Sequence, residues 1–317
     1  MELRTLGRSG LQVSVVGLGC NNFGGRIDLE ASRRVMHKAL DLGITLFDTA
    51  DVYGERGGSE TCLGQILGDR RKDIVLATKF AMPMDDAGTL KGASRRYVMS
   101  AVEASLKRLK TDWIDLYQVH RPDPQTPIEE TLRALDDLVR HGKVRYIGCS
   151  NYAAWQVVEA QFTARQIGSN AFISCQDEYS LLVRALEKDS MLAMQAHGLG
   201  LLPYFPLASG LLTGKYRRNA PRPQGARLSY MQNLADRYLT DANWTAVEKL
   251  DEFCRERSRN LVQLAFSWLA QRPTVASVIA GATKPEQVEQ NVAAVGWSLT
   301  SDDLAEIDRL TAKPPAT

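Results

Sequence analysis

The feature that most constrains the fold is an eightfold alternation of short apolar runs with longer stretches of helical periodicity. The apolar runs predict strands at residues 13–19, 44–50, 74–79, 113–120, 144–150, 171–176, 200–205 and 276–281. Helices are predicted between them, for example at residues 29–41, 95–109 and 128–140. Strands that alternate with helices form parallel βαβ units. Eight such units in 317 residues predict an α/β fold, a closed (β/α)8 TIM barrel.

An open, doubly wound dinucleotide-binding sheet is the main structural alternative. Its glycine fingerprint would follow an early strand, where the chain reads Gly17-Leu18-Gly19-Cys20-Asn21-Asn22. Asn22 stands where the third glycine belongs, so the fingerprint fails and the barrel is favoured.

Two segments depart from the alternation. Residues 3–14 contain alternating runs around a Gly-rich turn, which predicts an N-terminal β-hairpin. Residues 207–241, after the seventh strand, are too long and too rich in Pro, Gly and Arg for a simple connection. Such a loop often covers a bound ligand, and an insertion without a role is the alternative. We expect residues 1–317 to form one barrel domain, because barrels reach this length as single domains.

Composition argues against several classes of protein. The net charge is +2, from 39 Lys+Arg against 37 Asp+Glu, which gives no electrostatic reason to expect nucleic acid or a membrane as a partner. The five cysteines are scattered and form no C-x-x-C pair, so we expect reduced thiols and no metal site. No apolar run reaches membrane-spanning length, and the N-terminus lacks the apolar core of a signal peptide. We therefore expect a cytoplasmic protein.

Chemistry in a barrel of this kind lies where the strands end. Asp48, Lys79 and His120 end three predicted strands, and Tyr53 lies one short turn after Asp48. A free phenol has a pKa of about 10, which a nearby ammonium would lower. We expect Tyr53 to protonate a carbonyl oxygen and His120 to orient it, while Asp48 keeps Lys79 charged. Taken singly, Asp48 and Lys79 could form a structural ion pair, and Tyr53 could be a packing ring.

Four longer motifs are shared with a known family. They are Asp48-Thr49-Ala50 followed by Tyr53-Gly54, Ser59-Glu60 and Gly64; Arg145-Tyr-Ile-Gly-Cys-Ser150-Asn151-Tyr152; Pro206-Leu-Ala-Ser-Gly-Leu-Leu-Thr-Gly-Lys215; and Gly281-Ala-Thr-Lys-Pro-Glu-Gln287. On these motifs the chain resembles the aldo-keto reductases over nearly its whole length. The resemblance is strongest to a bacterial branch that is also similar to potassium-channel β-subunits. It implies a TIM barrel, NAD(P)H-linked reduction of aldehydes and ketones, and the catalytic residues Asp48, Tyr53, Lys79 and His120.

The resemblance also implies contacts with the cofactor. Ser150, Asn151 and Gln176 match positions that hold the nicotinamide carboxamide, and Tyr204 matches the aromatic residue that stacks on the ring. Such side chains offer the donors and acceptors that an amide needs. The other expected contacts lie in the last two motifs and just beyond them, at Pro206, Leu207, Ser209, Gly210, Leu212, Lys215, Gly281, Thr283, Lys284, Gln287, Gln290 and Asn291.

A preference for NADPH over NADH is expected from the last motif. Thr283 and Glu286 have the form of a capping box with Pro285 between them, which predicts a helix start just after the eighth strand. Helix N-termini attract phosphate, and Lys284 adds a cation there. NADH lacks the 2′-phosphate that would use these groups.

The expected substrate is a small aldehyde or ketone. We expect its binding pocket to be lined by Asn21, Phe23, Met82 and Arg121. These side chains are too mixed to select one compound, and the sequence does not indicate an oligomeric state. Two other functions stay open. One is a cofactor-binding redox sensor or regulatory subunit with little turnover, and the other is a Schiff-base aldolase that uses Lys79 without a nicotinamide.

Overall fold

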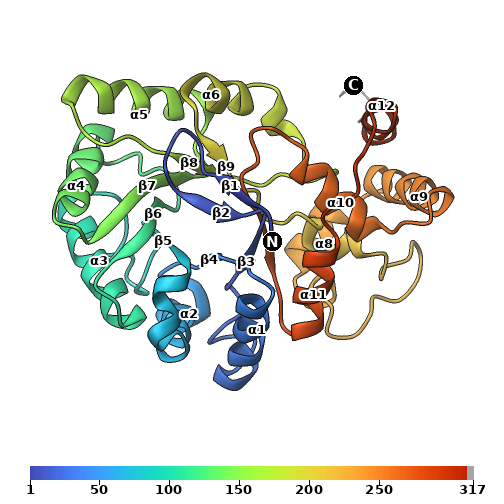
Figure 1. Ribbon diagram of the computed structural model, residues 1–317, viewed down its shortest axis with the longest axis horizontal. Helices are drawn as coiled ribbons and strands as arrows, with labels where there is room; N and C mark the ends of the chain where they lie inside the picture. Colours follow the sequence, from blue (N-terminus) through green and yellow to red (C-terminus); the bar gives the residue numbers. More distant parts are fainter. Residues whose placement is uncertain (313–317) are drawn as a thin grey trace.

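The core of the protein is a sheet of eight parallel strands that closes on itself, seen in a computed structural model that describes residues 1–312 (Figure 1). In sheet order the strands are β10 (Val278–Gly281), β3 (Val16–Gly19), β4 (Leu46–Asp48), β5 (Val75–Phe80), β6 (Ile114–Val119), β7 (Val144–Ser150), β8 (Ser174–Gln176) and β9 (Gly200–Leu201). The Leu201 N–H donates to the Thr274 carbonyl at 2.7 Å, and the Ala276 N–H donates to the Leu201 carbonyl at 3.0 Å. These bonds join β9 to the segment that leads into β10. The predicted barrel is therefore confirmed.

Each barrel strand coincides with one of the eight predicted apolar runs, and β5 extends one residue past its run, to Phe80. The first run is divided, because Val13 and Ser14 belong to the strand β2 and only Val16–Gly19 belongs to the barrel. Parallel strands in a barrel are covered on both faces, so they read as continuous apolar runs and not as alternating ones.

Helices surround the barrel in the order that the alternation predicts. They are α1 (Leu29–Asp41), α2 (Tyr53–Ile66), α3 (Arg95–Leu109), α4 (Ile128–Arg140), α5 (Ala154–Ile167), α6 (Ser190–His197), α9 (Asp241–Glu256), α10 (Leu261–Ala270), α11 (Pro285–Ala293) and α12 (Ser301–Thr311), with short 3-10 turns at Gly68–Asp73 and Ala185–Glu187. Local signals fix several of their ends. Asp28 accepts a hydrogen bond from the Ala31 N–H at the start of α1. Gly142 and Gly198 follow α4 and α6 with φ of +73° and +69°, as expected of C′ glycines.

The N-terminal hairpin closes one end of the barrel. Strands β1 (Leu3–Thr5) and β2 (Gln12–Ser14) pair antiparallel, as predicted. Leu6 and Val13 are buried against Leu46 and other inward-facing barrel residues. Figure 1 shows this hairpin lying across the barrel. The opposite end of the barrel, where the strands finish, is not covered by the hairpin and is open to a ligand.

The segment between β9 and α9 carries more structure than the sequence indicated. It holds a 3-10 turn at Ala208–Thr213 and two short helices, α7 (Arg227–Tyr230) and α8 (Gln232–Tyr238). We call residues 207–241 the cover segment. Its Pro- and Gly-rich composition hid these helices, which tertiary contacts stabilise: the Tyr216 hydroxyl accepts a bond from the Leu228 N–H, and Tyr238 donates to Glu178.

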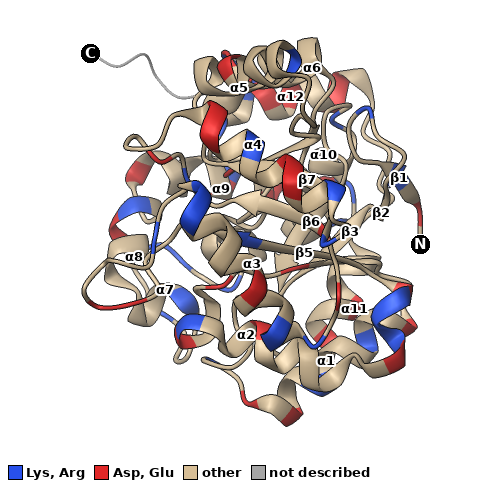
Figure 2. Ribbon diagram, turned by 90° about the vertical axis from the view of Figure 1, so that its left-hand side faces the viewer, with Lys and Arg blue, Asp and Glu red and all other residues tan. Residues whose placement is uncertain are grey.

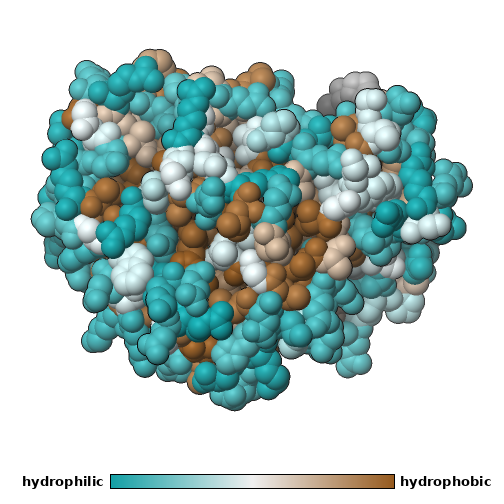
Figure 3. Space-filling view, viewed as in Figure 1, coloured by the Kyte–Doolittle hydropathy of each residue, from teal (hydrophilic) through white to brown (hydrophobic). Residues whose placement is uncertain are grey.

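The surface matches the near-neutral composition. Figure 2 shows basic and acidic residues interspersed over the helices on that side. Figure 3 shows the face that carries the hairpin, hydrophilic around its rim and with apolar side chains gathered near the middle. Among residues 1–312, no helix combines the length and apolar character that crossing a membrane requires.

Candidate active site

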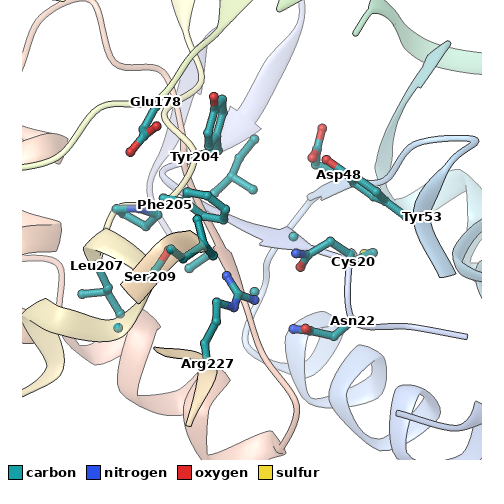
Figure 4. A pocket seen from close by; sticks show the side chains of 18 of the residues that line it. Cys20, Asn22, Asp48, Tyr53, Glu178, Tyr204, Phe205, Leu207, Ser209 and Arg227 are labelled. Atoms are coloured by element: carbon teal, nitrogen blue, oxygen red, sulfur yellow. The ribbon is translucent and has the colours of Figure 1, made fainter. Parts of the chain in front are cut away.

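A cavity of about 630 Å³ opens at the end of the barrel where the strands finish. This volume is in the range typical of sites for small molecules and cofactors. Its walls come from the ends of β3, β4, β6, β7, β8 and β10, from the cover segment, and from the start of α11. In Figure 4, Asp48 and Tyr53 lie on one side of the view, and Leu207 and Ser209 lie on the other.

A buried ion pair lies beneath one wall of this cavity. The Lys79 Nζ donates to Asp48 Oδ2 at 2.7 Å and to the Thr49 carbonyl at 2.8 Å. The Lys79 side chain has no exposed surface. Burial lowers the pKa of Lys79, but the Asp48 carboxylate and the Tyr53 phenol raise it by more, so the net pKa is above its ordinary value. The ammonium is therefore shielded, whereas a Schiff-base lysine must meet its substrate as a free amine.

Tyr53 lies over this pair and faces the cavity. The centroid of its ring is 5.1 Å from the Lys79 Nζ and 5.6 Å from the centroid of the His120 ring, with the two ring planes at 87°. The expectation that Lys79 lowers the pKa of the phenol below its ordinary value is wrong for this structure. Burial raises the pKa of Tyr53 by more than Lys79 lowers it, and Asp48 raises it further. The phenol is thus protonated at neutral pH, which is the form that can donate a proton.

His120 follows β6 and shares the cavity wall with Tyr53. Burial lowers the pKa of its imidazole to about 3, helped by the charges of Lys79 and Arg121. The ring is therefore neutral at physiological pH. Its Nδ1 atom is buried and has no hydrogen-bond partner within residues 1–312. A neutral imidazole can donate one N–H to an oxygen without carrying charge.

A left-handed turn directly follows Tyr53. The four residues 54–57 have φ between 60° and 114°, including the non-glycine residues Glu55 and Arg56. Such a conformation costs roughly 1–2 kcal/mol per L-residue, so surrounding contacts must stabilise it. The carbonyl of Phe23 would lie 2.4 Å from a Cβ at Gly54, so only glycine fits there.

Phe23 itself is fully buried and does not line the cavity, which corrects the expectation that it contacts substrate.

The polar residues at the ends of β7 and β8 form one connected group. The Gln176 Nε2 donates to Asp48 Oδ1 at 2.8 Å, and the Ser150 hydroxyl donates to the Gln176 carbonyl at 2.7 Å. The Asn151 side chain donates to the His120 carbonyl at 3.1 Å and accepts from the Tyr204 hydroxyl at 2.8 Å. These bonds tie the predicted carboxamide-binding residues to Asp48 and His120. Ser150, Asn151, Gln176 and Tyr204 all line the cavity.

Gln118 is a site residue that the sequence reasoning missed. It is fully buried on β6, and its Nε2 lies 3.4 Å from Asp48 Oδ1. Its position two residues before His120 was the available signal, because alternate residues of a strand share a face.

The cover segment supplies the opposite wall. Leu207, Ser209, Gly210 and Lys215 line the cavity as expected, together with Pro206 just before the segment. The Ser209 hydroxyl is buried and unpaired within the described chain, which suits a ligand-binding role. The Leu212 side chain instead packs in the core with no exposed surface, so a side-chain contact with cofactor is not supported.

Two cations of this wall were also missed. Arg26 and Arg227 line the cavity near Lys215. Burial lowers the pKa of Lys215, and the charges of these two arginines lower it further. The Arg26 guanidinium donates to the Gly225 carbonyl at 2.8 Å and lies over the Tyr230 ring, so it also ties the β3–α1 loop to the cover segment.

The start of α11 differs from the prediction. The N-cap is Lys284, not Thr283, and no side chain caps it. The Gln287 Oε1 instead accepts from the Thr283 N–H at 2.7 Å and from its hydroxyl at 3.2 Å, so Glu286 does not form the expected capping box. Lys284 is exposed and lies outside the cavity wall. The other expected residues here do line the cavity: Gly281, Thr283, Gln287, Gln290 and Asn291.

The three remaining substrate-contact candidates are placed as expected. Asn21, Met82 and Arg121 all line the cavity. Arg121 lies near His120, because its charge acts on that imidazole. One part of the cavity wall thus carries groups that can protonate a carbonyl oxygen. Another part carries amides, hydroxyls and cations that suit a dinucleotide. This combination is that of a nicotinamide-dependent oxidoreductase built on a barrel.

Comparison with known proteins gives the family. The model of the aldo/keto reductase family matches residues 15–312. Over 321 aligned residues the chain is 36% identical to L-glyceraldehyde 3-phosphate reductase of Escherichia coli (strain K12), covering 98% of this chain and 92% of that protein. It is 36% identical to the uncharacterized oxidoreductase YrpG of Bacillus subtilis (strain 168), covering 99% and 97% of the two chains. It is 38% identical to a probable voltage-gated potassium channel subunit beta of Oryza sativa subsp. japonica, covering 93% and 91%.

The chain belongs to the aldo/keto reductase family. It is accordingly an NAD(P)H-dependent reductase with a small-molecule carbonyl substrate, and the resemblance seen in its sequence is confirmed.

Proposed function

We propose that this chain reduces aldehydes or ketones to alcohols with NADPH, and that Tyr53 gives the proton to the carbonyl oxygen. The observation that carries the proposal is the shared cavity wall of Tyr53 and His120 above the buried Asp48–Lys79 pair. Bound NADPH supplies a hydride to the carbonyl carbon. The carbonyl oxygen then needs one proton to become the alcohol.

The residues divide this task. The neutral His120 N–H orients the carbonyl oxygen and polarises it. Tyr53 transfers its phenolic proton to that oxygen, and the nearby Lys79 ammonium stabilises the phenolate that remains. Asp48 keeps the ammonium charged and in position. The proton on Tyr53 is afterwards restored from solvent.

The cavity also fits the proposed cofactor. Ser150, Asn151 and Gln176 offer donors and acceptors for a carboxamide beside Asp48, and the Tyr204 ring lies next to them. The unpaired Ser209 hydroxyl and the cations Arg26, Lys215 and Arg227 suit the phosphates. A preference for NADPH rests on Thr283, Gln287 and the exposed Lys284 at the start of α11, where the free N–H groups and the cation would meet a 2′-phosphate.

The test is the oxidation of NADPH by the purified protein, followed by absorbance, across aldehydes and ketones of different size and polarity. Turnover of several of them, with the matching alcohol as product, is the expected result. A protein that binds NADPH but reduces none of them would refute the proposal.

A second candidate function is cofactor sensing by a regulatory subunit. Relatives named as probable potassium channel β-subunits, 38% identical over 93% of this chain, favour it. The same panel separates the two functions, because a sensor would hold NADPH tightly with negligible turnover.

A further inference from the structure

The cavity is lined by several basic side chains that have no acidic partner among residues 1–312. At the cover segment, Arg26, Lys215 and Arg227 line the same cavity, and the charges of the two arginines act on Lys215. Arg121 lines the cavity as well, and its charge acts on His120 and on Tyr204. The first group suits the phosphates of a dinucleotide. Arg121 lies with the residues proposed to act on the carbonyl.

Arg121 differs from its neighbours in having no partner. Lys79 is neutralised by Asp48, and Arg237 is paired with Glu178 at 2.5 Å. Within residues 1–312, the Arg121 side chain makes neither an ion pair nor a hydrogen bond, although it lines the cavity and is exposed. The Glu178 carboxylate is already occupied, because Tyr238 donates to its other oxygen. The two acids that line the cavity, Asp48 and Glu178, are thus paired with Lys79 and Arg237, and neither neutralises Arg121.

We propose that Arg121 binds an anionic group, a carboxylate or a phosphate, on the same molecule whose carbonyl is reduced. The proposal rests on the proposed function and names its substrate class: small aldehydes or ketones that carry a negative charge. A guanidinium suits this task, because its planar donors match two oxygens of a carboxylate or phosphate. Arg121 directly follows His120, so the anion and the carbonyl oxygen would be bound by adjacent residues.

The contact with Arg121 should raise the affinity of the protein for an anionic substrate, and added salt should reduce this gain. A hydrogen bond to a charged group contributes enough to change affinity by roughly tenfold or more. Because Arg121 is exposed, dissolved ions screen it, so the gain should shrink as ionic strength rises. The anion lies away from the reacting carbonyl and is held similarly before and during the reaction. The effect should therefore fall mainly on KM and not on kcat.

The experiment compares matched substrates that differ in one charge. Succinic semialdehyde is paired with its methyl ester, and glycolaldehyde phosphate with glycolaldehyde, each reduced with NADPH. For the unaltered protein, kcat/KM should be roughly tenfold or more higher for at least one charged member than for its neutral partner. The carboxylate and phosphate pairs show which anion is preferred. Arg121→Gln should bring the ratio close to one, and Arg121→Lys should keep part of it.

Two controls separate this role from others. Arg133→Gln removes an equal charge from the exposed face of α4 and should leave the ratio unchanged. NADPH affinity, measured by fluorescence titration, should be the same in Arg121→Gln and in the unaltered protein. If Arg121→Gln lowered kcat/KM equally for charged and neutral members, Arg121 would act through His120 and the proposal would be overturned. Weakened NADPH binding in that variant would overturn it as well.

The failure of this inference is distinguishable from failure of the proposed function. Reduction of the neutral members with no preference for either charged member would overturn the anion site and leave the reductase intact. If NADPH were oxidised by no substrate of either pair or of the wider panel, both proposals would fall together.

Discussion

Breaking the buried ion pair should destabilise the protein by an amount that the structure allows us to estimate. Asp48→Asn leaves the Lys79 ammonium, which has no exposed surface, with only neutral acceptors, the Thr49 carbonyl at 2.8 Å and the new amide oxygen, and with no negative charge to balance it. Removing one partner of such a pair typically costs about 3–5 kcal/mol. A typical domain has a free energy of unfolding of about 5–15 kcal/mol, so this is a large fraction of the total.

Urea unfolding at neutral pH is the assay, applied to Asp48→Asn, Lys79→Met and the double variant. The double variant should be more stable than Asp48→Asn alone, since it leaves no charge buried without a partner. Glu129→Gln, which breaks an exposed pair with Arg133 on α4, is the control and should cost less than about 1 kcal/mol. Losses that simply add in the double variant would refute the reasoning, because the two charges would then not depend on one another.

Three further predictions follow from other parts of the site. Lys284→Ala should weaken NADPH binding by roughly tenfold and leave NADH binding almost unchanged, because one charge-assisted contact is lost; equal weakening in fluorescence titrations would remove Lys284 as the discriminating residue. Deletion of residues 218–225 removes the Gly225 carbonyl that Arg26 contacts, so NADPH should dissociate faster in stopped-flow release; an unchanged rate with an unchanged melting temperature would indicate an idle insertion. Burial and Glu60 raise the pKa of Asp51 to about 8 from an ordinary value of 3.8. The folded protein therefore keeps a proton that the unfolded chain releases, so this group makes stability fall as pH rises from about 4 to about 8. Asp51→Asn should remove that part of the slope in urea unfolding at several pH values, and an identical slope would show that Asp51 does not titrate in this range.

The barrel and the main site residues could be predicted because each has a local signal. Eight apolar runs gave eight strands, and Asp48, Lys79 and His120 stood where such runs end. Parallel strands in a closed sheet bring their ends to one mouth. Three residues distant in the sequence are for that reason neighbours in space.

The features that were missed depend on tertiary contacts. The lowered pKa expected for Tyr53 took account of Lys79 but not of burial, which has the larger effect. The helix start at Lys284 depends on Gln287 reaching back to Thr283, a competition that a four-residue motif does not reveal. Phe23 was expected to contact the substrate, yet its side chain is fully buried in the core.

The cover segment shows the same limit. Its two short helices have few local signals and are fixed by bonds to distant residues, such as Arg237 with Glu178. The role of Arg26 could not be seen either, because its partner Gly225 lies in a segment with no regular pattern.

The most direct test of the account is the rate of carbonyl reduction by Tyr53→Phe, measured together with its affinity for NADPH. General acid catalysis typically contributes about 10²–10⁴-fold, and this substitution removes the proton while keeping the ring beside His120 and Lys79. We predict a loss of at least about a hundredfold in kcat for a good aldehyde substrate, with a nearly unchanged Kd for NADPH. A variant that reduces the aldehyde at close to the unaltered rate would contradict the assignment of Tyr53 as the proton donor.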